Sequence, residues 1–502
     1  MKKIFFLAFF SIFHILGYAQ IEFELRTNTL EIEDQFISII CDNAGSLYCT
    51  YVKENSIGLP DNFEQSFLLK ITPEEDTIWL NYSMPDTLLR LTKLYLDDDG
   101  NILLYGNGWK IDTNNSAYGK FLYFIKLNEE FEIFWKRGYH LENESNLTIT
   151  GDLIENQEGN FLFSATSLTQ PPPYSELLYF FEFSSDGDSL NFILMDDNYV
   201  GLMRSLTQKS NSGNVYCHME QGPPPPTGDT SICKRLELND AFNPVSFNYY
   251  PSRDYTGPFY TMNYEENSLL SFGTYWELIE GQRDRNYYLN ARILDSSLNI
   301  IHQVSLTNPE TKAYTAWLRG VDYYYPERIF VVGADKVETS LSFPESMDYI
   351  YVACLDENLN IIHEDFLESE NDFYLINSMC ATPDGGVAIA GGVYNFSYNN
   401  YKYDGYLLKL DSLQFVGIND INEEKKSARV TLYPNPASNN LFIRSDRFPI
   451  SFELVDITGK QFYYQYLESQ ETKLDVSKFP PGMYFWKIHK NGIQEFGKFI
   501  KK

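Results

Sequence analysis

Short apolar stretches separated by polar turns recur along most of the chain at a nearly constant spacing. One kind of stretch is an aromatic and aliphatic strand that ends in an apolar residue before a polar turn, as in residues 123–128 and 406–411. Its last apolar residues are 71, 127, 183, 238, 294, 355 and 410, so the steps between copies are 56, 56, 55, 56, 61 and 55 residues. Seven copies at one period indicate a repeat architecture.

A second kind of stretch alternates with the first and begins with a turn rich in Asn, Asp or Gly. Its clearest copies are residues 99–106, 158–163 and 384–391, and the earliest is 44–48. Because such turns supply the positive φ that tight hairpins need, each signature marks a β-hairpin. Two hairpins per period make four strands, and seven four-stranded units stacked radially form a β-propeller. An open solenoid is the structural alternative, but a period near 56 suits one blade.

We therefore predict an all-β fold with a seven-bladed β-propeller over residues 20–420. The last repeat has a predicted strand at 414–418 but little chain after it, so its outermost strand has to come from elsewhere. Residues 22–26 alternate apolar with charged side chains, as a half-exposed strand does. We expect this segment to close the ring by pairing in the last blade.

The repeats resemble those of bacterial extracellular propellers, in which an Asp-Gly-Gly turn, an apolar strand and a phrase like "DAYLLKLD" follow one another. The last repeat carries the resemblance best, with residues 404–411 reading DGYLLKLD, and Trp79 and Trp135 fall where that family often has Trp in the outer strand. Such propellers serve many functions, so the resemblance implies the fold and not an activity.

Beyond residue 420 the pattern changes. Residues 421–430 form a charged linker, and residues 431–502 contain short strands separated by Gly and Pro turns, as expected for a small β-sandwich. From residue 430 this tail holds ten basic and seven acidic residues, opposite in sign to the rest of the chain. The tail is therefore predicted to be an independent module.

The tail resembles the C-terminal sorting domain, type A, of substrates of the type IX secretion system. The resemblance rests on the Tyr-Pro-Asn-Pro opening, the Gly-Lys turn, a Leu-Asp-Val-Ser strand, a Gly-x-Tyr-Phe strand and a basic end; its motif residues are Tyr433, Pro434, Asn435, Pro436, Gly459, Gly482 and Tyr484. It implies that the outer-membrane translocon of that system is a partner and reads this domain. A fibronectin-like adhesive module is the alternative.

The amino terminus fits the same route. Two lysines, an apolar run from Ile4 to Leu16 and the small residues around Ala19 are typical of a secretory signal peptide over residues 1–19. The run is too short for a membrane anchor, and no apolar run of membrane length follows it. We expect a protein that passes through the periplasm and is secreted or held on the outer cell surface.

Charge and cysteine content limit which partners, disulfides and metal sites are expected. The 502 residues carry 39 Lys plus Arg against 69 Asp plus Glu, a net charge of −30, which argues against a nucleic-acid partner.

Export allows disulfides, and the two predicted hairpins would bring Cys41 near Cys49 and Cys217 near Cys233. Free thiols acting as small apolar residues are the equal alternative. No metal-ligand spacing occurs, so we expect neither a metal site nor a cofactor.

The sequence holds no recognisable catalytic motif. The few histidines lie in no hydrolase or zinc-protease frame, whereas carboxylates are abundant enough to allow a pair for glycoside cleavage. We expect a binding protein for an extracellular glycan or protein. A secreted polysaccharide hydrolase or lyase is the alternative from another class, and a structural surface or matrix protein is the third.

Tyrosine-rich connections are the candidate binding region. In an up-and-down blade the two hairpin turns point to one end of the ring, so the longer connections point to the other, and we expect the Tyr-rich segments there. Tyrosine with Asn and Ser on rigid loops suits sugar stacking or protein recognition. The candidate ligand-binding residues are Tyr324, Tyr325, Tyr398 and Tyr401.

Overall fold

The computed structural model describes the chain from residue 21 onwards, with gaps. The described residues are 21–27, 33–54, 65–82, 84, 87–111, 117–140, 150–168, 176–195, 202–208, 213–221, 232–239, 241–250, 255–265, 268–278, 285–306, 312–336, 349–368, 372–395, 403–411, 430–433, 436–445, 450–456, 461–467, 469, 471–490 and 493–502. The predicted signal peptide and the predicted strand at 414–418 lie outside them. The chain divides into two compact units, Met1–Val416 and Gly417–Lys502. No helix in the described part of the chain is long and apolar enough to cross a membrane.

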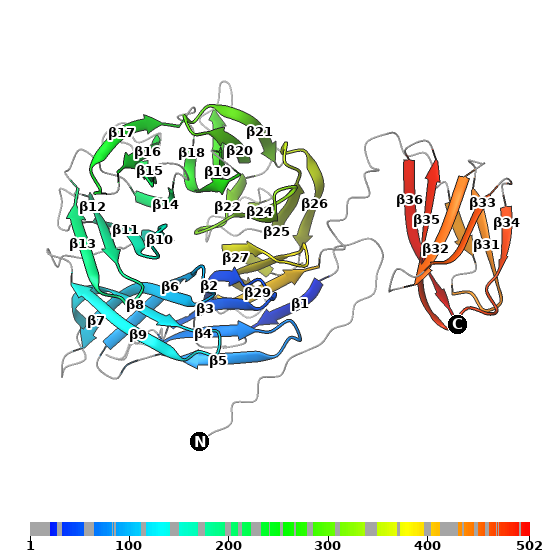
Figure 1. Ribbon diagram of the computed structural model, residues 1–502, viewed down its shortest axis with the longest axis horizontal. Coiled ribbons are helices and arrows are strands. Elements are labelled where there is room, and N and C mark those ends of the chain that lie inside the picture. Colours follow the sequence, from blue (N-terminus) through cyan, green and yellow to red (C-terminus); the bar gives the residue numbers. More distant parts are fainter. Residues whose placement is uncertain are drawn as a thin grey trace, which may run out of the picture. The chain divides into compact units, whose positions relative to one another are not determined.

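The first unit consists of seven antiparallel four-stranded blades. Figure 1 shows that they are arranged as a ring. Each blade is numbered here by its order in the chain and given from its innermost strand outwards. Blade one is β2 (Glu33–Cys41), β3 (Leu47–Glu54), β4 (Gln65–Ile71) and β5 (Thr77–Asn81); blade two is β6 (Thr87–Leu96), β7 (Ile102–Ile111), β8 (Ala117–Leu127) and β9 (Ile133–His140); blade three is β10 (Thr150–Glu155), β11 (Phe161–Leu168), β12 (Glu176–Phe183) and β13 (Ser189–Leu194).

The remaining blades follow the same plan, with one irregularity. Blade four is β14 (Leu202–Gln208), β15 (Val215–Gln221), β16 (Ile232–Leu238) and β17 (Pro244–Tyr249); blade five is β18 (Tyr255–Tyr264), β19 (Ser268–Leu278), β20 (Arg285–Asp295) and β21 (Ile300–Leu306). Blade six has an inner strand in two pieces, β22 (Lys312–Thr315) and β23 (Val321–Tyr325), followed by β24 (Arg328–Lys336), β25 (Tyr349–Leu355) and β26 (Ile361–Glu368). A parallel pairing of β22 with β20 joins blades five and six.

The ring closes through the start of the described chain. Blade seven consists of β27 (Asp372–Ala381), β28 (Val387–Asn395), β29 (Asp404–Leu410) and, outermost, β1 (Ile21–Arg26), which lies beside β29 in Figure 1. The predicted closure by residues 22–26 is confirmed. A side-chain contact reinforces it, because Arg26 forms an ion pair of 2.7 Å with the nearly buried carboxylate of Asp372 on β27.

Apolar side chains pack between neighbouring blades around the whole ring. Seven buried clusters each draw residues from two adjacent blades, including one between blades seven and one that contains Phe36 and Leu407. A single four-stranded sheet therefore buries both of its faces only when both neighbours are present. Polar contacts cross the same interfaces; for example, Asn377 on β27 donates a hydrogen bond of 2.9 Å to the carbonyl of Phe36 on β2.

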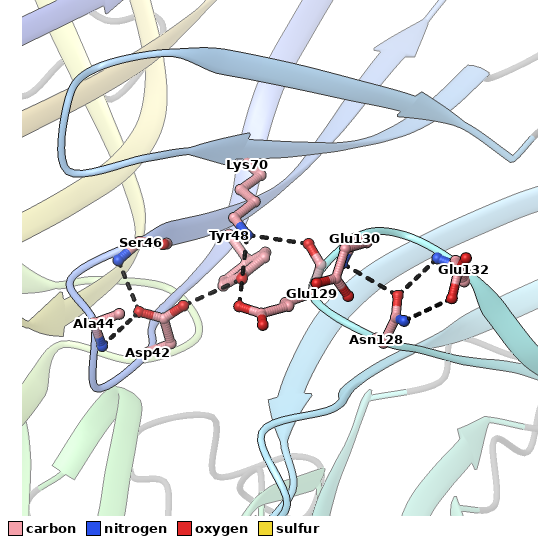
Figure 2. Close-up of polar contacts among 9 residues, drawn as sticks. All are labelled: Asp42, Ala44, Ser46, Tyr48, Lys70, Asn128, Glu129, Glu130 and Glu132. Atoms are coloured by element: carbon pink, nitrogen blue, oxygen red, sulfur yellow. Dashed lines mark hydrogen bonds and ion pairs between the residues drawn. The ribbon is translucent and has the colours of Figure 1, made fainter.

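Most of the described hairpin turns share one five-residue design, to which the two-residue turn from β23 to β24 is an exception. The first residue of the five-residue design has a side-chain oxygen that accepts backbone N–H groups further along the turn: Asp42 accepts from Ala44 and Ser46 at 2.9 and 2.8 Å, and Asn128 accepts from Glu130 and Glu132 at 3.1 and 2.8 Å (Figure 2). This local bond satisfies the turn amides and explains why Asp, Asn, Ser and Thr open these turns.

The fourth residue of these turns has a positive φ. Between the first and second strands of several blades it is Gly, as at Gly45 with φ 91°, which carries no Cβ to clash. Between the third and fourth strands it is often a large apolar residue instead, such as Phe242 and Leu359, which are only 2% exposed. Burial against the neighbouring blade offsets the cost of the left-handed backbone at these positions.

The cysteines are free thiols, so neither expected disulfide forms. Strand register is the physical reason. In both hairpins a leucine stands directly opposite the first cysteine, which leaves Cys41 two residues out of register with Cys49 and Cys217 three out of register with Cys233. Side chains displaced diagonally by two residues lie about 7–8 Å apart, beyond the separation that a disulfide spans. Burial raises the pKa of the Cys41 thiol to about 12.

The second unit is a two-sheet sandwich. One sheet is β30 (Val430–Tyr433), β31 (Asn440–Ser445) and β34 (Glu471–Asp475), and the other is β33 (Gln461–Leu467), β32 (Ile450–Asp456), β35 (Gly482–Lys490) and β36 (Ile493–Lys501). Tyr484 is buried in the core and donates to the carbonyl of Pro480 at 2.9 Å, while Tyr433 stacks on Phe442. Of the other predicted motif residues, Pro436 and Gly482 are described, whereas Pro434, Asn435 and Gly459 lie outside the described residues.

Candidate functional site

The two ends of the propeller differ in their connections. In blade one the turns from β2 to β3 and from β4 to β5 lie at one end of the sheet, and the segment from β3 to β4 joins the strands at the other end. We call the first end the tight-turn end. Antiparallel pairing repeats this arrangement in the later blades. The predicted separation of tight turns from longer connections is confirmed.

The predicted placement of Tyr324 and Tyr325 is wrong. They are the last residues of β23, and Tyr325 pairs with Arg328 across a two-residue turn that leads into β24. They therefore lie at the tight-turn end and not among the longer connections. Tyr398 and Tyr401 fall outside the described residues.

Tyr324 and Tyr325 nevertheless form an ordered, exposed aromatic pair. Their side chains are 38% and 42% exposed, and their rings meet edge to face with centroids 4.9 Å apart. The Tyr325 hydroxyl donates to the carbonyl of Pro383 at 3.1 Å, and the Tyr324 hydroxyl makes a longer contact of 3.4 Å with the side-chain oxygen of Asn43. These partners belong to the first turns of blades seven and one. We call the four residues the tyrosine platform.

A second group of side chains, all titratable, lies on or beside the innermost strands. Lys93, Asp152, Arg204 and Tyr260 come from blades two to five, and Arg319 from the inner strand of blade six. We call these five residues the central cluster. Their distribution over five blades means that only closure of the ring brings them towards one axis.

Burial and charge act in opposite directions on the central cluster. Burial raises the pKa of the Asp152 carboxyl, and the charges of Lys93 and Arg319 partly oppose this rise; the amide of Leu206 donates to the carboxyl at 2.8 Å. Burial lowers the pKa of Lys93, which the charge of Asp152 opposes. Burial also raises the pKa of the Tyr260 hydroxyl. Desolvation thus favours the neutral form of each of these three groups.

Each arginine of the central cluster has its own carboxylate. Arg204 Nε lies 2.9 Å from Glu220, and the same guanidinium contacts that carboxylate through Nη2. Arg319 is paired with Asp322 at 2.5 Å, and the other oxygen of Asp322 accepts the amide of Ala381 at 3.0 Å. These carboxylates are engaged in structural contacts. Among the described residues, no group of three His, Cys, Asp or Glu side chains is placed to hold a metal ion.

Sequence reasoning did not find the central cluster, although the repeats contain a signal for it. Lys93 and Asp152 each stand four residues before the first residue of the following turn, where blades one and seven have Ser38 and Ser378. Strand bulges occur at the same position along some inner strands, for instance between Leu91 and Lys93 in β6. Superposing the repeats would have shown that this position changes from serine to charged residues.

The tail decides the export route. Residues 431–502 match the family described as the secretion system C-terminal sorting domain. The tail is a type IX sorting domain. Through it the protein is exported to the cell surface or the extracellular space by the type IX secretion system, as the sequence predicts.

No curated protein sequence matches this chain. Solved structures with similar folds include a protein of unknown function from Dyadobacter fermentans (12% identity, TM-score 0.44, covering 78% of this chain and 99% of that chain). They also include the polysaccharide lyase Uly1 (11% identity, TM-score 0.43, 78% and 99%) and the α-L-arabinofuranosidase Arb93A from Fusarium graminearum (12% identity, TM-score 0.41, 68% and 98%).

Proposed function

We propose that this exported protein binds a glycan at or beyond the cell surface, and that the tyrosine platform makes the contact. The observation that carries the proposal is the geometry of Tyr324 and Tyr325. Stacking on a sugar needs an apolar aromatic face that is accessible and held in place. Both rings are exposed, and contacts with blades one and seven fix them on a rigid ring.

Catalysis by the described residues has weaker support. A tyrosine that removes a proton needs a lowered pKa, whereas burial raises that of Tyr260. Cleavage by paired carboxylates needs two that are free to act, whereas Glu220 and Asp322 are held in ion pairs. These observations favour a binding protein over the polysaccharide hydrolase or lyase that is the alternative.

The test compares two variants of the full-length mature protein on an array of neutral and acidic polysaccharides. The double variant Tyr324→Ala/Tyr325→Ala should lose about thirtyfold in affinity, because each of the two exposed rings contributes about 1 kcal/mol. Tyr249→Ala is the matched control, since Tyr249 is 61% exposed but lies on the outermost strand of blade four. The control should bind like the parent protein.

Three results would reject the proposal. The first is unchanged glycan binding by the double variant, and the second is a fall in its melting temperature of the size expected for core residues. The third is binding of a protein ligand with no affinity for any glycan. Release of reducing ends or unsaturated sugars from the same array would instead support the enzymatic alternative.

A further inference from the structure

The tight-turn end of the propeller, where the tyrosine platform lies, carries charge of one sign. The described residues of its turns include exposed Asp or Glu side chains in every blade except blade four, for example Glu75, Asp99 and Glu357. No Lys, Arg or His occurs at the described positions of these turns. A surface of this kind attracts ligands of the opposite charge over about 8–10 Å at physiological salt.

The lysines that contact these turns lie behind the carboxylates. The ammonium of Lys126 is 2.9 Å from the carboxylate of Asp97, and the Lys126 side chain is only 9% exposed. The Lys70 ammonium donates to the carbonyl of Glu129 at 3.1 Å (Figure 2); the Lys70 side chain is 12% exposed, whereas that of Glu129 is 59% exposed. The cations thus support the turns from inside, and the carboxylates face the solvent.

Exposed carboxylates also adjoin the tyrosine platform. Glu327 lies in the two-residue turn directly after Tyr325, is exposed, and forms no ion pair with any described residue. Asp384 follows the residue whose carbonyl accepts the Tyr325 hydroxyl; it is 41% exposed, although Lys409 is paired with it at 2.7 Å. The cation of the same turn, Arg328, is half-buried. The exposed charges next to the platform along the chain are therefore negative.

An aromatic pair in an acidic surface selects among sugars by their charge. The carboxylate of a uronate or the sulfate of a sulfated sugar is repelled by Glu327 and Asp384. A protonated amine, by contrast, forms a charge-assisted hydrogen bond with a carboxylate and is attracted to the face of a tyrosine ring. The sugar ring itself supplies an apolar face that stacks on an aromatic side chain. A glycan with free amino groups therefore fits both features of this surface.

We infer that the tyrosine platform binds an amino sugar with a free, protonated amine, as part of a cationic polysaccharide. Tyr324 and Tyr325 contact the sugar ring, and Glu327 binds the ammonium group. This inference rests on the proposed glycan binding and adds the charge class of the ligand. The aromatic pair is the site, and the carboxylates around it determine which sugar it accepts.

The experiment uses two hexasaccharides with the same backbone: the fully deacetylated chitosan hexamer and the fully N-acetylated chitin hexamer. Each is titrated into the full-length mature protein in a slightly acidic buffer, in which the chitosan amines are protonated. The chitosan hexamer should bind about tenfold more tightly, and added salt should reduce this preference because it screens surface charges. A galacturonate hexamer should bind more weakly than the chitin hexamer.

Four variants locate the preference. Glu327→Gln should reduce it by about fivefold, as expected for one exposed charge pair, and should leave the affinity for the chitin hexamer unchanged. Glu327→Lys should remove the preference. Glu130→Gln is the matched control, because Glu130 is an exposed acid in the outer turn of blade two, and it should bind like the parent protein. Tyr324→Ala/Tyr325→Ala should weaken binding of both hexamers.

The outcomes separate this inference from the proposed function. Equal binding of the two hexamers, lost in the double tyrosine variant, overturns the inference and leaves glycan binding by the platform standing. Absence of binding to any glycan rejects both. A chitosan preference that survives Glu327→Lys or the double tyrosine variant, or equally tight binding of an oligolysine, indicates general attraction of cations and also overturns the inference.

Discussion

The ammonium of Lys126 lies 2.9 Å from the carboxylate of Asp97, and the two side chains are only 9% and 2% exposed. Asp97 opens the first turn of blade two, and Lys126 stands at the end of the third strand of that blade. The ammonium also lies 5.1 Å from the ring centroid of Phe161 in blade three. One ion pair thus connects a turn, a strand and the neighbouring blade.

We predict that Lys126→Met destabilises the propeller by about 3 kcal/mol, because it leaves a buried carboxylate without its partner. Adding Asp97→Asn should restore most of the loss, since the amide keeps a side-chain oxygen for the turn and carries no charge. Urea unfolding measures both effects. The control is Arg137→Met: Arg137 and Asp188 are 3.9 Å apart and largely exposed, so the change should stay within about 0.5 kcal/mol.

The stability of the propeller should fall as the pH drops below about 6.5, in part because of His218. This imidazole is fully buried between Thr207 and Tyr250, and burial, followed by the charge of Arg235, lowers its pKa well below 6.5. Below pH 6.5, His218 therefore binds a proton in the unfolded chain but stays neutral in the folded chain. The expected loss is up to about 1.4 kcal/mol for each pH unit below 6.5.

The contribution of His218 is measured as a difference between proteins. Urea unfolding of the parent and of His218→Gln at pH 7.5 and 5.5 should show a smaller pH-dependent loss in the variant, because glutamine cannot be protonated in this range. Equal losses in the two proteins would contradict the assignment to His218.

The same backbone substitution should have opposite effects at two turns. Glu75 and Leu359 both have a left-handed backbone, with φ of 66° and 63°, but Glu75 is exposed and Leu359 is 2% exposed. Glu75→Gly should stabilise the protein by about 1 kcal/mol by relieving backbone strain. Leu359→Gly should destabilise it by about 2 kcal/mol, since the lost burial exceeds that relief. Thermal unfolding of the two variants gives the signs directly.

Removal of the sorting domain should stop export at the periplasm. A chain ending before Thr431 lacks the entire matched domain but keeps every strand of the propeller. We expect the truncated protein in the periplasmic fraction and the intact protein at the surface or in the medium. The complementary fusion joins residues 421–502 to an unrelated periplasmic reporter and should send it outward. Surface levels that do not change on truncation would contradict the sorting role.

The blades could be predicted because their signals are local. Asp-Gly and Asn-rich turns, such as that at Asp384, set hairpin geometry within a few residues. The number of repeats at one period then gives the number of blades. The two-residue turn after Tyr325 has Pro and Glu in place of Gly or Asn, so the sequence does not mark it as a tight turn. The sorting domain could be predicted equally well, because its motif residues occur in a fixed order.

The central cluster brings together residues that are far apart in the sequence, and no local sequence pattern predicts this proximity. Lys93 and Asp152 are 59 residues apart and look like any polar positions on alternating strands. Closure of the ring alone places them on one axis. The interrupted strand that exposes Trp317 is held by contacts with β27, and the register of such contacts is set by tertiary packing.

Closure of the ring by β1 also sets an order of events for the emerging chain. β1 leaves the ribosome well before its partner β29, which follows nearly 400 residues later. During that interval it is an unpaired edge, and its glutamates and arginine oppose pairing with other chains. A chain stopped anywhere before residue 404 leaves both ends of the ring open, so the propeller reaches its full stability only when synthesis of the last blade is complete.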